Sequence, residues 1–244
     1  MCRFARFFLT LLCLGPAVAG SAQDPLKVLP ESYKLQLENE WVRVMRVHYP
    51  PQSKLAAHDH TKAAAAYVYL NNAGPVLFKH VGLSYGGVER PATVDGTFRL
   101  YSAIEEVHEV ENPNDTPSDF LRVEFKTEPL GARRLRGRYP AEPYPAGENY
   151  AKVQFENEQI RVTRLACATR KPCELTTEAT LPALLVALAP ARLAVAGKAE
   201  HWTLAKGQTE WLQPGSKRSA LSQEPSPAAF LLFEMKTAPV KAAS

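Results

Sequence analysis

The sequence LENEWVRVMRV, residues 37–47, returns later in the chain as FENEQIRVTRL, residues 155–165. The segments that close the two copies also match, because FLRVEFK at 120–126 has its counterpart in FLLFEMK at 230–236. A repeat of this kind indicates that one structural unit occurs twice in the chain. The repeat therefore predicts two domains of the same fold.

The segment between the two copies differs in composition from both. It is rich in proline, glycine and arginine and contains the basic run RRLRGR at 133–138. No aromatic platform or glycine-rich loop adjoins this run, so we interpret it as a solvated linker rather than a phosphate site. The predicted organisation is an N-terminal domain at 29–126, a linker at 127–148, a C-terminal domain at 149–236 and a tail at 237–244.

Both copies alternate apolar and polar residues with a period of two. Val42 and Val44 follow this pattern in the first copy, as do Ile160 and Val162 in the second. Other short segments, such as YVYL at 67–70, are rich in β-branched and aromatic residues and are bounded by turn formers. Many short strands at near-regular spacing predict an all-β fold of antiparallel sandwiches or barrels.

The four alanines at 63–66 favour a helix by intrinsic propensity. Four residues are too few to nucleate a helix between strand-forming neighbours. We therefore predict a strand at this position.

Three histidines of the first copy are candidates for a metal site. His58 and His60 are two residues apart, so their side chains share one face of an extended strand. His108 lies downstream, just before the turn-forming sequence PNDTP at 113–117. If the two strands are neighbours, three imidazoles face one cavity, which is a familiar ligand set for zinc or iron. The alternative is that these histidines are solvated or hydrogen-bonded.

The histidine motifs resemble those of the cupins. His58-x-His60 follows Pro50-Pro51-Gln52, and Asn112 follows His108 at the fourth residue. The resemblance covers both copies, so the chain resembles a bicupin, with two jelly-roll-like β-barrels in tandem. It implies that His58, His60 and His108 bind a divalent metal ion, which could be iron, zinc, manganese or nickel, and that Asn112 supports them.

The first copy also departs from the cupin pattern. Gln52 replaces a glycine, and the glutamate ligand of the family would fall at Ala64 or Ala65. Three histidines still suffice for a metal and leave open positions for water and substrate. The candidates for a fourth ligand or an acid–base group are His80, Glu105 and Glu106. The alternative is that His80 is an interior histidine and that the two glutamates are solvated turn residues.

The second copy does not retain the histidines. Thr176, Glu178 and Arg218 occupy the three corresponding positions. These side chains do not form a metal site, so we predict a degenerate second barrel in which Glu178 and Arg218 form an ion pair.

The N-terminus resembles a secretory signal. Arg3 and Arg6 precede the apolar run FFLTLLCL at 7–14, and the small residues AVA follow at 17–19. We predict a signal peptide at 1–22 and a secreted or periplasmic protein. The run is too short for a membrane anchor, and no longer apolar run follows, so no membrane span is expected.

Charge and cysteine content agree with an exported protein. Removal of Arg3 and Arg6 lowers the formal net charge from +4 to +2, which does not favour nucleic-acid binding. Cys167 and Cys173 remain after cleavage of residues 1–22. In an oxidising compartment this close pair can form a disulfide; the alternative is that both stay reduced.

Two functions remain open on the sequence alone, because this fold hosts many unrelated activities. One is a metal-dependent oxygenase, isomerase or hydrolase that acts on a small molecule. The other is a non-catalytic secreted binding or structural protein. The resemblance to cupins also implies a homodimer formed through edge strands.

Overall fold

The computed structural model describes residues 23–60, 62–82, 87–103, 106–128, 135–145, 147–222 and 226–240. Within these ranges the chain forms nineteen strands in four sheets and one short helix, α1 (Pro25–Val28). The prediction of an all-β fold is confirmed. Among these residues no helix is long and apolar enough to cross a membrane. The predicted signal peptide lies outside the described residues.

The first copy forms two antiparallel sheets that enclose a buried core. The six-stranded sheet has the order β1 (Tyr33–Glu38), β2 (Val42–Tyr49), β9 (Ser118–Phe125), β4 (Ala64–Tyr69), β7 (Phe98–Tyr101), β10 (Gly137–Tyr139). The four-stranded sheet has the order β3 (Ser53–His60), β8 (Glu106–Asn112), β5 (Val76–His80), β6 (Val88–Arg90). Strand β10 lies in the range predicted as linker, and it adds an edge strand to the first barrel by pairing with β7.

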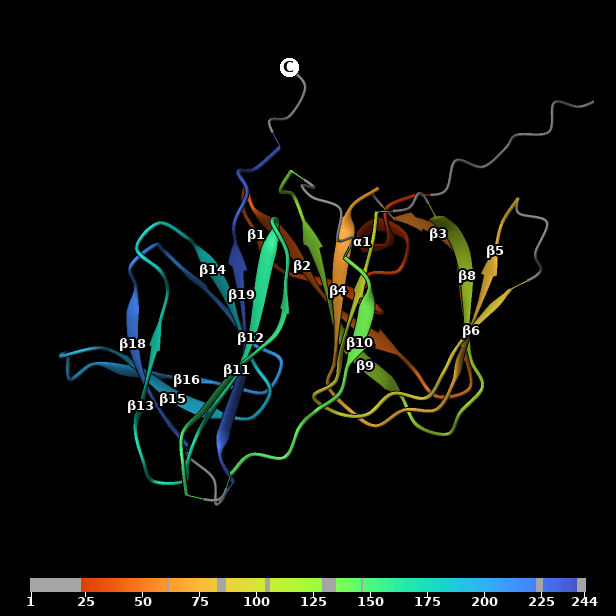
Figure 1. Cartoon of the computed structure of the whole chain (residues 1–244). Coiled ribbons are helices and arrows are strands. Elements are labelled where there is room, and N and C mark those ends of the chain that lie inside the picture. The colour runs from red at the N-terminus through yellow and green to blue at the C-terminus, as the bar shows by residue number, and fades with distance from the viewer. Residues whose placement is uncertain are drawn as a thin grey trace, which may run out of the picture.

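The second copy repeats this arrangement with each strand ten places further along. Its five-stranded sheet has the order β11 (Tyr150–Glu156), β12 (Ile160–Cys167), β19 (Ala228–Met235), β14 (Ala183–Ala187), β17 (Thr209–Leu212). Its four-stranded sheet has the order β13 (Cys173–Thr176), β18 (Lys217–Ser222), β15 (Ala191–Val195), β16 (His201–Leu204). The two barrels lie side by side, the second on the left and the first on the right of Figure 1.

The repeated ENE sequence forms the same turn in both barrels. Asn39 Oδ1 accepts hydrogen bonds from the backbone N–H groups of Trp41 and Val42. Asn157 Oδ1 does the same for Gln159 and Ile160. A side chain that accepts from the backbone two and three residues ahead stabilises a tight turn, and this turn joins the first two strands of each barrel.

The repeated lysine that follows β9 in the first barrel and β19 in the second pairs with the first glutamate of its ENE sequence. Lys126 Nζ lies 2.5 Å from Glu38 Oε1, and Lys236 Nζ lies 2.7 Å from Glu156 Oε1. The two ends of each sequence repeat therefore meet in space. These exposed pairs contribute little stability, but they show that the repeat in sequence is also a repeat in structure.

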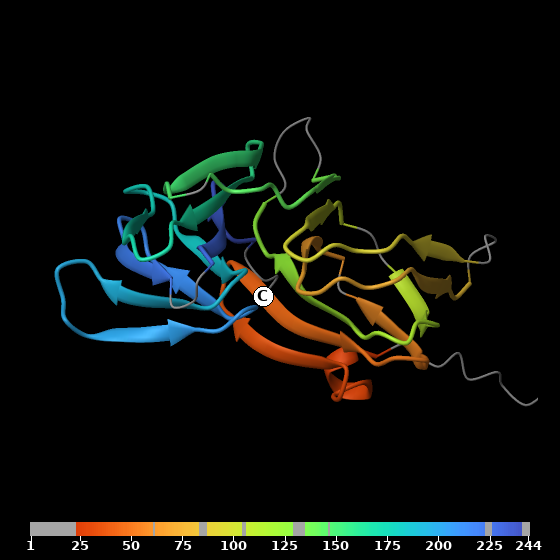
Figure 2. The ribbon, with the colours of Figure 1, turned by 90° about the horizontal axis from the view of Figure 1, so that it is seen from below.

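The two larger sheets pack against each other through a shared apolar core. The Phe233 ring of β19 lies 6.1 Å from the rings of both Phe98 and Phe125 in the first barrel. Figure 2 shows the ribbon from below, with strands of the two barrels meeting at the centre of the molecule. Because β19 is buried on both faces, its residues AAFLLF at 228–233 are a continuous apolar run rather than an alternation.

The alanine-rich segment is a strand, as predicted. In β4, Ala64, Ala66 and Val68 face the core between the barrels. Tyr67 and Tyr69 alternate with them and face the interior of the first barrel. Both faces of β4 are therefore used, one for packing and one for the cavity described below.

Cys167 at the end of β12 and Cys173 at the start of β13 form a disulfide. The Cys173→Ser variant is expected to lose about 2 kcal/mol of unfolding free energy, because a bridge over so short a loop restricts the unfolded chain only modestly. Urea unfolding of both proteins, with and without a reductant, measures this loss. The difference should vanish in reductant; equal stability without reductant would show that the bridge contributes nothing.

The predicted ion pair between Glu178 and Arg218 is wrong. Arg161 reaches Glu178, and it also binds Glu234, which lies directly across the strand pair β12–β19. Arg218 Nε lies 2.8 Å from Glu210 instead. Alignment of the two copies identified equivalent positions, but it could not show which neighbouring strand each long side chain would reach.

Candidate metal centre

A β-bulge directs the first two histidines into the first barrel. The register between β3 and β8 shifts between Leu55 and His58. Between the pairs Leu55–Val110 and His58–His108, β3 has one residue more than β8. In a regular strand Leu55 and His58, three positions apart, would point to opposite faces. With the extra residue, both are buried in the interior, and His60 follows on the same face.

The third histidine lies directly across the sheet from the first. His58 pairs with His108 in the register of β3 and β8. The three rings have centroid separations of 4.9 Å for His58–His60, 4.8 Å for His58–His108 and 5.1 Å for His60–His108. One nitrogen of each ring lies within 4.8 Å of one nitrogen of the others, and all three residues are buried. The structure therefore brings together the trio that the sequence predicted.

Hydrogen bonds fix which nitrogen of His58 points toward the cluster. Nδ1 lies 2.9 Å from the carbonyl oxygen of Ala56, so this nitrogen carries the proton and donates it. Nε2 therefore has the lone pair and accepts from the Tyr33 hydroxyl at 3.0 Å. A histidine that donates to a backbone carbonyl through one nitrogen is held in the orientation that metal-binding histidines commonly have.

Tyr33 and Tyr49 form a buried hydroxyl pair beside the cluster. Their oxygens are 2.8 Å apart, and because Tyr33 donates to His58, Tyr49 donates to Tyr33. Burial raises the pKa of both phenols above their ordinary value of 10, so both remain protonated donors. Neither tyrosine was among the residues predicted from the sequence.

The surroundings keep His60 in the form that can bind a metal ion. Burial lowers its pKa well below the ordinary value of 6.5, and the positive charge of Arg122 acts in the same direction. His60 is therefore a neutral imidazole at pH 7, and its buried Nδ1 has no hydrogen-bond partner. A neutral ring is the form that a metal ion requires.

The predicted candidates for a fourth ligand differ in where they lie. His80 lies across the sheet from His108, with a ring separation of 5.8 Å, and is outside the trio. The backbone of Glu106 pairs with that of His60, but its side chain lies outside the described part of the structure. Glu105 lies outside it entirely.

Asn112 supports the loop that follows His108. Its Nδ2 donates to the carbonyl oxygens of Tyr49, Pro50 and Thr116 at 2.8–3.2 Å. With its amide group used in this way, Asn112 holds together the ends of β2 and β8 rather than pointing a ligand atom at the histidines.

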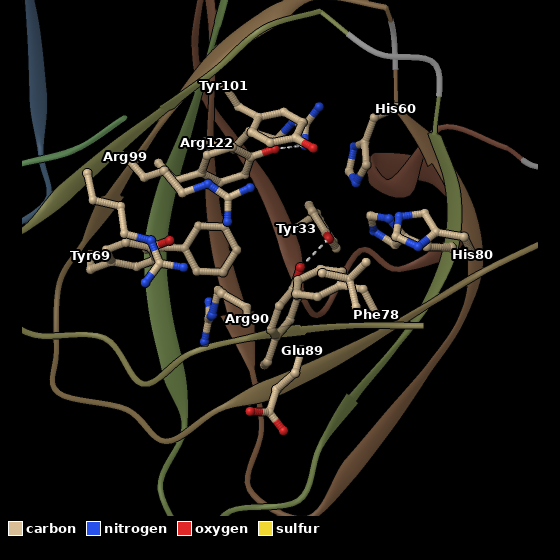
Figure 3. A pocket seen from close by; sticks show the side chains of 16 residues that line it. Tyr33, His60, Tyr69, Phe78, His80, Glu89, Arg90, Arg99, Tyr101 and Arg122 are labelled. Atoms are coloured by element: carbon tan, nitrogen blue, oxygen red, sulfur yellow. Dashed lines mark hydrogen bonds between the residues drawn. The ribbon is translucent and has the colours of Figure 1, made fainter. Parts of the chain in front are cut away.

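A cavity of about 180 Å³ opens beside the cluster. His60, His80 and His108 form one wall, and Figure 3 shows Arg99 and Arg122 on the opposite side. Tyr33 lies between them, and Phe78 lies beside the histidines, with its ring 5.0 Å from that of His108. The histidines therefore face a space that a small molecule could occupy.

Arg122, which lines the cavity, forms a buried ion pair with Glu124. Arg122 Nε lies 2.8 Å from Glu124 Oε1, and a second guanidinium nitrogen donates to the Tyr67 hydroxyl at 2.7 Å. The sequence did carry a signal for this pair. In FLRVEF the two charged residues are two positions apart in an otherwise apolar strand, which places both on one buried face.

Among the described residues, the second barrel contains no comparable cluster. In the described part of the chain, Thr176, Glu178 and Arg218 belong to no group of metal-ligating side chains. The interior of this barrel is filled by apolar residues such as Leu185, Leu193 and Phe230.

No known family profile matches the sequence, and no curated protein is similar to it. Solved structures do share the fold. A cupin 2 conserved barrel domain protein from Leptotrichia buccalis aligns over 84% of this chain and 88% of its own, with 12% identity and a TM-score of 0.53. AerE from Microcystis aeruginosa aligns over 84% and 97%, with 11% identity and a TM-score of 0.57.

A third structure describes Mn(II) centres in oxalate decarboxylase from Bacillus subtilis. It aligns over 90% of this chain and 73% of its own, with 12% identity and a TM-score of 0.52. At such low identity these comparisons establish the fold and no activity.

Proposed function

We propose that this chain, which has the fold of a bicupin, binds one divalent metal ion through His58, His60 and His108 and acts through it on a small molecule. The second barrel then provides the packing partner of the first. Iron, zinc, manganese and nickel are all compatible with three imidazoles, since such a site does not discriminate strongly among them.

The observation that carries this proposal is the burial of three imidazoles around one point. Ligand atoms around an ion bound at about 2.1 Å are roughly 3 to 4 Å apart. The nitrogens here lie within 4.8 Å of one another, so a small rotation of the rings would complete the set. Three protein ligands leave coordination positions open toward the cavity.

The metal ion would supply Lewis acidity to an oxygen atom of the bound molecule. The protein groups have separate tasks. His58 is oriented by the Ala56 carbonyl, and Arg122 holds the Tyr67 hydroxyl in the cavity wall. The burial of the three histidines would limit the contact of the ion with bulk water.

The alternative is a non-catalytic binding protein. It is favoured by the alanines at the position of the family's glutamate ligand and by the second barrel, which lacks the histidines. We further propose that the chain is exported, on the basis of the N-terminal segment and of the Cys167–Cys173 disulfide, which an oxidising compartment would preserve.

A titration of chelator-treated full-length protein with Mn²⁺ tests the proposal. We expect saturable binding of one ion per chain. Binding that does not saturate would refute the metal site. Turnover of a small substrate by the loaded protein alone would support the enzyme, whereas ion binding without any turnover would support the alternative.

The Tyr33→Phe variant probes how the site is prepared for the metal. In the metal-free protein the Tyr33 hydroxyl donates a hydrogen bond to His58 Nε2, the nitrogen that would bind the ion. Without the hydroxyl, the ion no longer has to displace this hydrogen bond. We expect metal affinity to rise by about fivefold and the stability of the metal-free protein to fall by about 1 kcal/mol, the usual net value of one hydrogen bond.

Competition with a chelator measures this affinity, and Tyr49→Phe is the matched control. That variant keeps the bond from Tyr33 to His58 and should leave metal affinity unchanged. A tenfold loss of affinity in Tyr33→Phe would instead identify the hydroxyl as a ligand.

A further inference from the structure

Arg90, the last residue of β6, is a buried cation for which the described residues provide no counter-ion. The residue is 5% exposed, and one guanidinium nitrogen donates to Ser118 Oγ at 2.9 Å. The guanidinium carbon lies 5.4 Å from the Tyr69 ring centre and 5.7 Å from that of Phe120. Nε is buried with no hydrogen-bond partner. None of the described acidic side chains forms an ion pair with it.

Other buried arginines of this chain are compensated. Arg122 pairs with Glu124, and the partly buried Arg43 pairs with Asp24 at 2.6 Å. Arg164 has no carboxylate either, but Gln154 and the carbonyl of Gly96 accept from it. Arg90 is different because it combines deep burial with only one hydrogen bond, and cation–π contacts offset only part of that cost.

The rest of the cavity adds positive charge. Arg99 and Arg138 also line it, and the described structure shows no ion pair for either. Burial lowers the pKa of Arg90, and the charges of Arg99 and Arg138 lower it further, but a guanidinium stays protonated at neutral pH. Glu89 is the acidic residue at the cavity, and Figure 3 shows its carboxylate turned away from the histidines.

The shape of the cavity limits what can bind. The space is about 180 Å³, and its walls include the rings of Tyr69, Phe78 and Phe120. A guanidinium presents two parallel donors that match a carboxylate. The cavity therefore has the features expected for a small, flat and anionic ligand.

We propose that this cavity binds a small organic carboxylate, with the carboxylate paired to Arg90 and the apolar body held by the aromatic walls. The inference names a ligand class for the proposed site. It rests on the proposed function only for the role of the histidines on the other side of the cavity. Arg90 is a binding residue in this account and holds no metal.

Calorimetric titration of chelator-treated full-length protein tests the inference without depending on the metal. The probes are benzoate, its neutral analogue benzamide, and inorganic phosphate. We expect benzoate to bind, and benzamide and phosphate to bind at least about tenfold more weakly, because only benzoate combines the charge with a flat apolar body.

The Arg90→Gln variant should weaken benzoate binding by at least about tenfold. It removes a buried charge, so its thermal stability should equal or exceed that of the wild type. Arg90→Lys, which keeps the charge but loses the two parallel donors, is a second variant and should also bind more weakly. The controls are Arg138→Gln, at an exposed position of the cavity, with at most about a fivefold effect, and Arg192→Gln in the second barrel, with none.

Three results would overturn the inference: no benzoate binding to the wild type, equal binding to the wild type and both Arg90 variants, or phosphate binding as tight as that of benzoate. The metal content of Arg90→Gln should match that of the wild type. If the chain binds no metal but benzoate binding still depends on Arg90, the proposed function fails and the carboxylate site stands.

Discussion

Replacement of His58 by alanine is expected to abolish stoichiometric metal binding. His58 is one of only three protein ligands in the proposed site, and its Nε2 is fixed toward the cluster by the bond from Nδ1 to the Ala56 carbonyl. Loss of a residue that merely supports a ligand costs about 10- to 100-fold in affinity. Loss of the ligand itself should exceed about 100-fold, and His60→Ala and His108→Ala should behave in the same way.

His48→Ala is the matched control for this series. His48 is a half-exposed histidine of the same barrel, and its ring bonds to Asp119 outside the cluster. Metal content measured by elemental analysis after dialysis against Mn²⁺ should be normal in this variant and absent in the other three. Normal metal content in any of the cluster variants would show that the ion is held elsewhere.

Replacement of Glu124 by leucine is expected to lower the unfolding free energy by about 3 to 5 kcal/mol. The variant leaves the Arg122 guanidinium buried without its carboxylate, and the side chains of both residues are less than a tenth exposed. An uncompensated buried charge costs this much because it has lost its hydration and has no opposite charge nearby in return. Chemical denaturation measures the loss.

Two variants complete this experiment. Glu38→Leu removes a partly exposed pair with Lys126 and should cost at most about 1 kcal/mol. The double variant Arg122→Met with Glu124→Leu should recover most of the lost stability, because no buried charge remains. A loss below about 1 kcal/mol in Glu124→Leu would mean that Arg122 is not electrostatically dependent on Glu124.

The sequence was sufficient to predict the repeated β architecture. The ENE turns and the closing strands are local signals, and each formed the same structure in both copies. The spacing of His58 and His60 also placed them on one face, because a strand has a fixed period. The prediction of an ion pair between Glu178 and Arg218 was wrong, because the sequence does not show which neighbouring strand a long side chain reaches.

The cavity could not be predicted from the sequence. Tyr33, His60 and Arg90 are far apart along the chain, and only the closure of the barrel places all three around one cavity. The bulge before His58 also has no clear sequence signal, although it decides which way that histidine points. Glu124 and Arg122 carried a usable signal, namely two charges in phase within an apolar strand.

The most direct test of the central claim is a crystal structure of the Mn²⁺-soaked protein with an anomalous difference map. The account predicts a single strong peak in the first barrel, within about 2.3 Å of a nitrogen of His58, His60 and His108, and no peak in the second barrel. A map with no peak among these three rings, or with its main peak elsewhere, would contradict it.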